Sequence, residues 1–142
     1  MEIRKYTKQD EQQLFDLMEK EGEEWICCWK EVGKPSYLKA LEKDTTYVVI
    51  CDDKLCGFMR CIGSFTIYID DLLVDKAYRG RDFGRHLMEA VCRDHPDKEV
   101  YVMSDVDEYY LTLGYVKAGT LFIVTAKGGD TYDTTNRFTK KR

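Results

Sequence analysis

A short basic turn at residues 78–85 is the part of the sequence whose residue types and spacing best suit chemistry. It reads Tyr-Arg-Gly-Arg-Asp-Phe-Gly-Arg, follows a β-rich run at 66–74, and opens an amphipathic helical pattern. The first turn of a helix has unpaired backbone N–H groups and a partial positive charge, both of which attract phosphate. Three arginines add forked hydrogen-bond donors. The turn therefore predicts a phosphate-binding loop, although a solvated arginine-rich loop would have the same composition.

Two adjacent carboxylates, Asp70 and Asp71, lie in the β-rich run just before this turn. A carboxylate beside a reacting amine can act as a general base. Since side chains alternate between the two faces of a strand, we expect only one of the pair to face a cleft. The alternative is that both are surface carboxylates at a strand edge. Opposite faces also argue against a cation site formed with Asp75, and we predict no metal site.

Apolar periodicity and turn residues predict the elements that must position these groups. The expected strands are residues 3–6, 47–51, 55–62, 66–74 and 100–103, followed by a terminal hairpin of 116–118 and 120–125. The expected helices begin near residue 10, near 35 and at 83, and a short last one at 107–113 is closed by Gly114. Residues 21–34 are ambiguous. The predicted order, β-α-α-β-β-β-α-β-α-β-β, belongs to the α/β (α+β) class, with a mixed sheet of about seven strands flanked by helices.

Length and charge limit the classes of function. A chain of 142 residues predicts one domain, which we place at 1–126, with an irregular tail at 127–142. A formal net charge of −4 argues against nucleic acid as a partner, because backbone binding needs a basic face. No apolar run approaches the roughly 20 residues of a membrane-spanning helix, and the N-terminus lacks the apolar segment of an export signal. We therefore expect a cytoplasmic protein with no membrane partner.

The six cysteines form no C-x-x-C motif, and there are only two histidines. In a cytoplasmic protein this composition argues against disulfides and against a zinc site. We expect free thiols that act as small core hydrophobes. The adjacent pair Cys27–Cys28 is the candidate exception, because it lies in the ambiguous segment between Trp25 and Trp29.

Two blocks of the sequence resemble the GNAT superfamily of N-acetyltransferases. The first is the strand and loop at 69–84, where the family pattern is a strand, then Arg or Gln, two residues, Gly, one residue, Gly or Ala, and a helix. Arg79 stands at the Arg/Gln position and Gly84 at the last Gly, whereas Asp82 stands where a Gly is usual. The second block, 109–115, resembles the family's aromatic-Tyr-x-x-x-Gly-aromatic signature. The two blocks occur in the family's order, with a predicted strand between them.

The resemblance implies a GNAT-type, mostly antiparallel sheet and the use of acetyl-CoA as cosubstrate to acetylate an amine by direct attack on the thioester. A splay between two strands would admit the thioester. Backbone groups of the strand would bond the pantetheine arm: Leu72, Leu73 and Val74. The loop would hold the pyrophosphate through Arg79, Gly80, Arg81, Asp82, Phe83, Gly84 and Arg85.

The resemblance also implies the catalytic residues. Asp70 stands where many members carry an acidic base, and Tyr110 would lie near the coenzyme sulfur. A tyrosine hydroxyl, with a pKa of about 10, is a suitable acid for the leaving thiolate. Tyr109 and Leu113 are four residues apart and are expected to pack inward on one helical face, which turns Tyr110 toward the cleft. The alternative is that Tyr110 is a packed aromatic without a catalytic role.

The acceptor, a small-molecule or peptide amine, is not specified by these residues. By analogy with the family, residues 23–29 are expected to form part of the acceptor wall. Glu23, Glu24, Trp25 and Trp29 would suit a cationic amine, whereas the alternative is that the tryptophans pack in the core. Two other functions stay open, a non-catalytic acyl-CoA-binding module on the same fold and an interaction protein without a coenzyme. The oligomeric state also stays open, a homodimer included.

Overall fold

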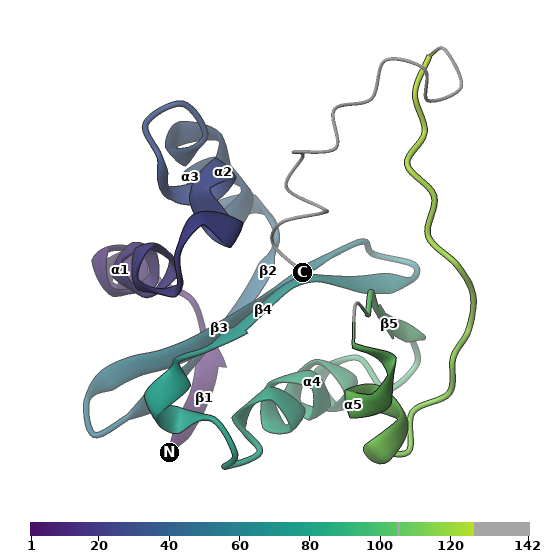
Figure 1. The fold of residues 1–142 in the computed structure, drawn as a ribbon. Coiled ribbons are helices and arrows are strands. Elements are labelled where there is room, and N and C mark those ends of the chain that lie inside the picture. The colour runs from purple at the N-terminus through teal and green to yellow at the C-terminus, as the bar shows by residue number, and fades with distance from the viewer. Residues whose placement is uncertain (105, 127–142) are drawn as a thin grey trace.

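The computed structural model describes residues 1–104 and 106–126, which form a five-stranded sheet between two layers of helices (Figure 1). The strands are β1 (Glu2–Lys5), β2 (Thr45–Cys51), β3 (Lys54–Ile62), β4 (Ile67–Val74) and β5 (Val100–Val102). The helices are α1 (Glu11–Glu21), α2 (Ile26–Trp29), α3 (Lys34–Lys43), α4 (Phe83–Asp94) and α5 (Asp107–Thr112). Short 3-10 turns, η1 (Lys8–Asp10), η2 (Glu23–Trp25) and η3 (Lys76–Tyr78), precede α1, α2 and the loop before α4.

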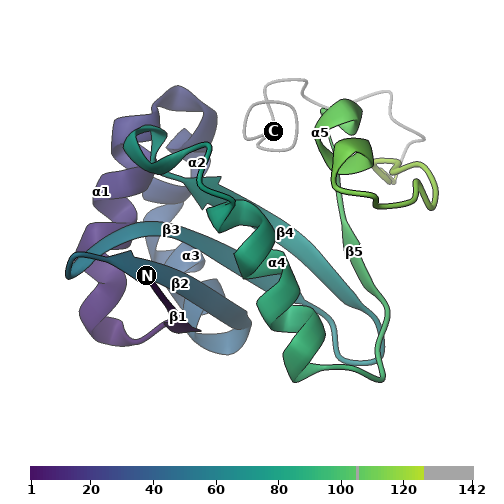
Figure 2. The same ribbon diagram turned by 90° about the horizontal axis from the view of Figure 1, so that it is seen from below.

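The strand order in the sheet is β1-β2-β3-β4-β5. The first four strands pair antiparallel, and β5 pairs parallel to β4 after the crossover through α4, which lies across one face of the sheet in Figure 2. The predicted turn between β2 and β3 is confirmed, because Asp52 and Asp53 both adopt positive φ, at 52° and 63°. Two successive left-handed residues match the right-handed twist of the strands that they join. The structure is thus the mixed, mostly antiparallel α+β fold that was predicted.

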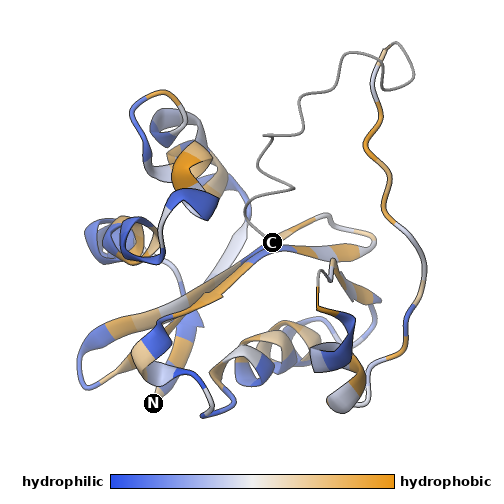
Figure 3. Ribbon diagram, viewed as in Figure 1, coloured by the Kyte–Doolittle hydropathy of each residue, from blue (hydrophilic) through white to orange (hydrophobic). Residues whose placement is uncertain are grey.

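Alternation along β2 and β3 divides the core into two clusters. Val48 and Phe58 face α1, α2 and α3, whereas Val49 and Met59 face α4. The predicted stripe of α4 is confirmed, since its residues spaced by four are almost fully buried: Phe83 (6% exposed), Leu87 (0%) and Val91 (0%). In Figure 3 the helices alternate between hydrophobic (orange) and hydrophilic (blue) residues along the ribbon, as amphipathic helices do. None of the helices in the described residues is long and apolar enough to cross a membrane.

The predicted terminal hairpin at 116–118 and 120–125 is not formed. These residues belong to no strand, so the described part of the chain has five strands instead of about seven. Their composition is β-rich, but a strand also needs a neighbour for its backbone and a face on which to pack. Val124, for example, is 91% exposed. The irregular tail predicted at 127–142 lies outside the described residues.

Asp10 occupies the N-cap position of α1, as the sequence suggested, but its carboxylate makes no cap bond to the helix. It instead accepts two bonds from the Arg4 guanidinium, both at 2.8 Å, and one from the backbone N–H of Thr7 at 2.8 Å. Asp10 thereby ties the end of β1 to the start of α1.

Candidate active site

The fork between β4 and β5 is the first feature of the candidate site. The two strands pair at Ile67–Val100, Tyr68–Tyr101 and Ile69–Val102, and no pair follows among the described residues. From Asp70 onward β4 therefore pairs only with β3 and keeps an open edge. An open edge of this kind can bond an extended amide-containing ligand.

The register decides which residues of β4 turn their backbone groups to this edge. Asp75 donates its N–H to the Cys56 carbonyl of β3 at 2.8 Å, and Leu73 pairs with Phe58 two residues earlier. Because antiparallel residues turn alternately toward and away from their partner strand, Leu73 faces β3, whereas Leu72 and Val74 face the open edge. We therefore no longer expect the backbone of Leu73 to bind the ligand, because its N–H and C=O groups face β3.

The loop before α4 contains two residues with positive φ. Gly80 has φ of 82°, and Asp82, the N-cap of α4, is left-handed with φ of 63°. A left-handed backbone explains why the family usually has glycine at the position of Asp82. Aspartate is among the few other residues that adopt this left-handed conformation. The Asp82 carboxylate is exposed and lies 3.3 Å from Nη2 of Arg85, whose Nη1 donates to Glu89 at 2.8 Å.

Gly84 brings three elements together at the start of α4. A Cβ at this position would lie 3.1 Å from the hydroxyl of Tyr109 on α5 and 4.0 Å from Cδ2 of Leu72 on β4. The open edge of β4, the α4 N-terminus and α5 therefore converge at one point. Any residue other than glycine at position 84 would place side-chain atoms in the space between these three elements.

The packing predicted for α5 is wrong for its two tyrosines, whereas Leu113 packs inward as predicted. Tyr110, with Leu113 and Tyr115, packs against the α4-side core, whereas Tyr109 is 43% exposed. The Tyr110 ring stacks on Tyr115 at 6.5 Å and meets Tyr109 edge-on at 5.0 Å between ring centroids. Partial burial, and to a lesser degree the charge of Asp82, raises the pKa of Tyr109, so its hydroxyl stays protonated at neutral pH. The sequence did not indicate that the Tyr109 hydroxyl lies beside Gly84, because local sequence does not determine which side of so short a helix packs against the rest of the protein.

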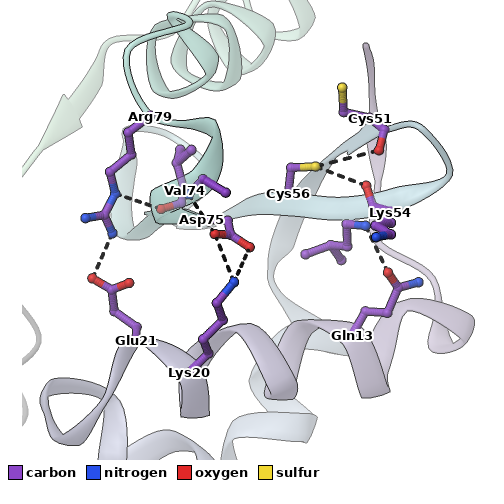
Figure 4. Close-up of polar contacts among 11 residues, drawn as sticks. Gln13, Lys20, Glu21, Cys51, Lys54, Cys56, Val74, Asp75 and Arg79 are labelled. Carbon is purple, nitrogen blue, oxygen red and sulfur yellow. Dashed lines mark hydrogen bonds and ion pairs between the residues drawn. The ribbon is translucent and has the colours of Figure 1, made fainter.

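Arg79 points away from the loop that it begins (Figure 4). Its Nε donates to the Val74 carbonyl at 2.9 Å, and its Nη2 donates to Oε1 of Glu21 on α1 at 2.7 Å. Beside it, Lys20 Nζ lies 3.1 Å from Oδ2 of Asp75. Two ion pairs thus join the end of α1 to the end of β4. No signal in the sequence pointed to Lys20 or Glu21, which lie more than fifty residues earlier in the chain.

The two carboxylates of β4 do not face opposite sides, which corrects the prediction from alternation. Asp70 and Asp71 both bind the guanidinium of Arg60 on β3; Nε of Arg60 donates to Oδ2 of Asp71 at 2.6 Å, and Nη2 donates to Asp70. The cause is a β-bulge. Arg60 pairs with Asp71 but the next residue, Cys61, pairs with Ile69, so Asp70 is the extra residue. A bulge of this kind re-aims the side chain that it carries.

Arg60 is the centre of a buried polar cluster. Its Nη1 also donates to Oδ2 of Asp44, just after α3, at 2.6 Å, and Asp71 accepts a bond from the Tyr37 hydroxyl at 2.5 Å. Arg60 is 5% exposed, Asp71 0% and Asp70 8%. Burial works to lower the pKa of Arg60, but the charges of Asp71 and Asp70 and the hydrogen bond to Asp71 outweigh it and raise that pKa above its usual range. Arg60 was not among the site residues predicted from the sequence, although a single charged residue within the otherwise apolar strand 55–62 indicates a buried ionic contact.

The expected acceptor wall at 23–29 places its tryptophans in the core, as the alternative reading had it. Trp25 is 3% exposed and meets Phe58 edge-on at 5.7 Å, and Trp29 donates its indole N–H to the Gly22 carbonyl at 3.3 Å. Glu23 and Glu24 are exposed. The thiols of Cys27 and Cys28 lie 3.4 Å apart, with Cys28 1% exposed. In the described part of the chain, no three His, Cys, Asp or Glu side chains are grouped so as to hold a metal ion.

Comparison with known proteins gives the class of this fold. A family model described as an acetyltransferase (GNAT) domain matches residues 42–117, more than half of the chain. The chain therefore belongs to the GNAT acetyltransferase family. No curated protein matches it.

Solved structures of the family share the fold. A GNAT family acetyltransferase from Streptococcus pneumoniae TIGR4 is 18% identical with a TM-score of 0.67, over 87% of this chain and 97% of that one. AAC(6')-Iy, solved with a bisubstrate analogue containing CoA, is 14% identical with a TM-score of 0.70, over 87% and 96%. Glucosamine-6-phosphate N-acetyltransferase from Arabidopsis thaliana is 14% identical with a TM-score of 0.64, over 88% and 97%. At these identities the similarity is one of fold.

Proposed function

We propose that this protein transfers the acetyl group of acetyl-CoA to an amine acceptor. The observation that carries the proposal is the open edge of β4 at Leu72 and Val74, which leads directly to the N-terminus of α4. Backbone groups at this edge suit the amides of a pantetheine arm, although the Val74 carbonyl already accepts a bond from Arg79, and a helix N-terminus suits a pyrophosphate. Both are available at one place only because β4 and β5 separate after Ile69.

The residues present fit the coenzyme. Gly84 leaves room beside the first turn of α4, and the left-handed Asp82 keeps the loop shape while its carboxylate lies beside Arg85. The proposed binding set is the backbone of Leu72 and Val74 with the loop residues Arg79, Gly80, Arg81, Asp82, Phe83, Gly84 and Arg85. Arg79 contributes its backbone to the loop, whereas its side chain fixes the end of β4.

Acetyl-CoA, when bound, supplies the thioester that the acceptor amine attacks. We assign the removal of the amine proton to Asp70, directly or through a water. A lysine-like amine with a pKa of about 10.4 needs about 4–5 kcal/mol to lose that proton at pH 7, so a base is useful. Asp70 is the first residue of β4 beyond its last pair with β5, where the thioester would enter.

We assign protonation of the leaving thiolate to Tyr110, on the family resemblance. The Tyr109 hydroxyl lies beside Gly84, at the phosphate-binding end of the site. We therefore assign Tyr109 to the binding of acetyl-CoA and Tyr110 to the chemical step. The two roles predict different kinetic effects of removing each hydroxyl.

The acceptor is proposed only as a class, a small-molecule or peptide amine. Similar solved structures include an aminoglycoside N-acetyltransferase, a glucosamine-6-phosphate N-acetyltransferase and a ribosomal-protein-alanine N-acetyltransferase, so the shared fold does not select one acceptor. The exposed Glu23 and Glu24 beside α2 favour cationic amines in the first panel to be tested.

A second candidate is a non-catalytic acyl-CoA-binding module. The ion pair between Asp70 and Arg60 favours it, because a carboxylate held by a guanidinium is a weaker base. An acceptor panel of polyamines, aminoglycosides, amino sugars and peptides, read out as release of free CoA thiol, separates the two. Turnover on any amine supports the transferase. Saturable acetyl-CoA binding in calorimetry, without turnover on any member, supports the binding module.

A further inference from the structure

The cluster around Arg60 is not explained by stability alone. One guanidinium meets three carboxylates, of which Asp70 and Asp71 are buried and Asp44 is partly exposed. Taking such charges out of water costs several kcal/mol each, and apolar residues of similar volume are often equally stable. A buried arrangement of this kind at a strand fork therefore calls for another explanation.

The location of the cluster gives one. Arg60 pairs with Asp71, and the bulge makes Asp70 the next residue toward the fork, directly after Ile69, where β4 and β5 part. Counted from Asp71, which faces α3, strict alternation would place Asp70 on the α4 side of the sheet, where Leu87 lies. The bulge and Arg60 together bring Asp70 to the side of the sheet that carries α1, α2 and α3.

The three carboxylates have distinct positions in this cluster. Asp71 is fully buried and receives the Tyr37 hydroxyl, and Asp44 anchors Nη1 from the end of α3. These two fix the plane of the guanidinium. Asp70 binds the remaining corner, Nη2, and retains 8% exposure. A planar fork held at two corners presents its third corner in a fixed direction.

We propose that Arg60 is a positioning residue for the transfer reaction, which holds the ionised carboxylate of Asp70 at the β4–β5 fork while Asp44 and Asp71 hold Arg60. The inference rests on the proposed function, in which Asp70 is the base. Arg60 acts through Asp70 and does not itself touch the substrates. A neighbouring cation favours the ionised form of a carboxylate, so removal of the Arg60 charge is expected to change the pH dependence of the reaction.

Other ionisable groups face the cluster from each packed element. They are Tyr37 on α3 and Cys28 on α2, beside the cluster's own Asp44 and Asp71, whereas Cys61, next to Arg60 on β3, lies in the core on the α4 side. Burial, and then the charge of Asp71, raises the pKa of Tyr37 well above its usual range, and burial raises the pKa of Cys61 to about 12. Tyr37 and Cys61 therefore keep their protons at neutral pH and do not account for a loss of activity in acid.

The test measures kcat/KM against pH, with acetyl-CoA and an acceptor from the panel, for wild type, Arg60→Gln and Arg60→Lys. In Arg60→Gln we expect the acidic limb to move up by about 1–3 pH units, because the neighbouring cation is lost. In Arg60→Lys the cation remains but the fork is lost, so the limb should stay near its wild-type position. In the same Arg60→Lys variant kcat should fall by roughly tenfold or more, because even a small displacement of the Asp70 carboxylate from its position would slow the chemical step.

Arg4→Gln is the matched control. It removes another arginine–aspartate pair, Arg4 with Asp10, at the opposite edge strand. A general loss of stability should appear in both variants in thermal unfolding, whereas the shift of the pH limb should appear only in Arg60→Gln. An equal shift in Arg4→Gln would overturn the proposal.

Asp70→Asn separates this inference from the proposed function. If Asp70→Asn loses activity while the acidic limb of Arg60→Gln stays at its wild-type pH, Arg60 does not position the base. In that case the inference fails and the proposed function stands. If Asp70→Asn turns over like wild type, Asp70 is not the base and both assignments fail. Should Arg60→Gln not fold, wild-type kcat in the folded Arg60→Lys variant would overturn the inference.

Discussion

The guanidinium of Arg79 bonds the carboxylate of Glu21 at 2.7 Å, and so the first residue of the loop at 79–84 is tied to the last turn of α1. The same guanidinium donates to the Val74 carbonyl at the open edge of β4. The Arg79 side chain therefore fixes the end of the strand on which the pantetheine arm would lie, and it does so from outside the loop itself.

Arg79→Ala is expected to weaken acetyl-CoA binding by roughly tenfold, the equivalent of one charge-assisted hydrogen bond, because the end of β4 loses its anchor. Calorimetric titration with acetyl-CoA measures the change. Lys20→Met is the control, since it removes the neighbouring exposed ion pair with Asp75 and touches neither Val74 nor the loop. Equal affinities of Arg79→Ala and wild type would exclude a role for the Arg79 side chain.

Asp82→Gly is expected to leave acetyl-CoA binding unchanged or to tighten it. Glycine adopts the φ of 63° without a Cβ penalty, and the change removes a carboxylate from the loop that we propose binds the pyrophosphate. Asp82→Ala should instead lower the free energy of unfolding by about 1 kcal/mol relative to Asp82→Gly, since alanine is strained in the left-handed region. Urea unfolding and calorimetry measure both effects. A large loss of affinity in folded Asp82→Gly would mean that the carboxylate itself takes part in binding.

Tyr109→Phe and Tyr110→Phe form a matched pair, because each removes one hydroxyl and keeps the ring. Tyr110→Phe is expected to lower kcat by about 10²–10⁴-fold, the usual contribution of a general acid, with little change in the KM for acetyl-CoA. Tyr109→Phe is expected to raise that KM by a few-fold and to leave kcat nearly unchanged, because its hydroxyl lies at Gly84. Steady-state kinetics of both variants decide the matter, and the reverse pattern would exchange the two roles.

Asp10→Asn is expected to destabilise the protein in a pH-dependent way. The bonds from Arg4 lower the pKa of Asp10 below its ordinary 3.8, although burial opposes them. A lowered folded-state pKa means that the stabilisation is complete above about pH 4 and is lost as the pH falls below it. We expect the variant to lose about 2 kcal/mol of unfolding free energy at pH 7 and progressively less below pH 4. Urea unfolding of wild type and variant at pH 7 and pH 3 measures the difference, and an equal deficit at both would refute the assignment.

The sequence alone was sufficient for features that depend on a few neighbouring residues. The buried stripe of α4 follows from apolar residues spaced by four, and the turn at Asp52 and Asp53 follows from residues that tolerate positive φ. The loop at 79–84 was recognised in the same way, because a short motif fixes both its shape and its position before the helix. The left-handed Asp82 then explained the one departure from the family pattern.

Other features were decided by contacts between distant segments. Alternation predicted opposite faces for Asp70 and Asp71, but the bulge depends on the register between β3 and β4. The pairing of Arg79 with Glu21 and the covered side of α5 likewise depend on how helices lie on the sheet. The absent hairpin after Tyr115 shows the same limit, since β-rich composition does not supply the neighbouring strand that pairing needs. Local pattern specifies which elements form and which face is apolar, whereas register and packing decide which polar groups meet, because those contacts join residues that no short-range pattern connects.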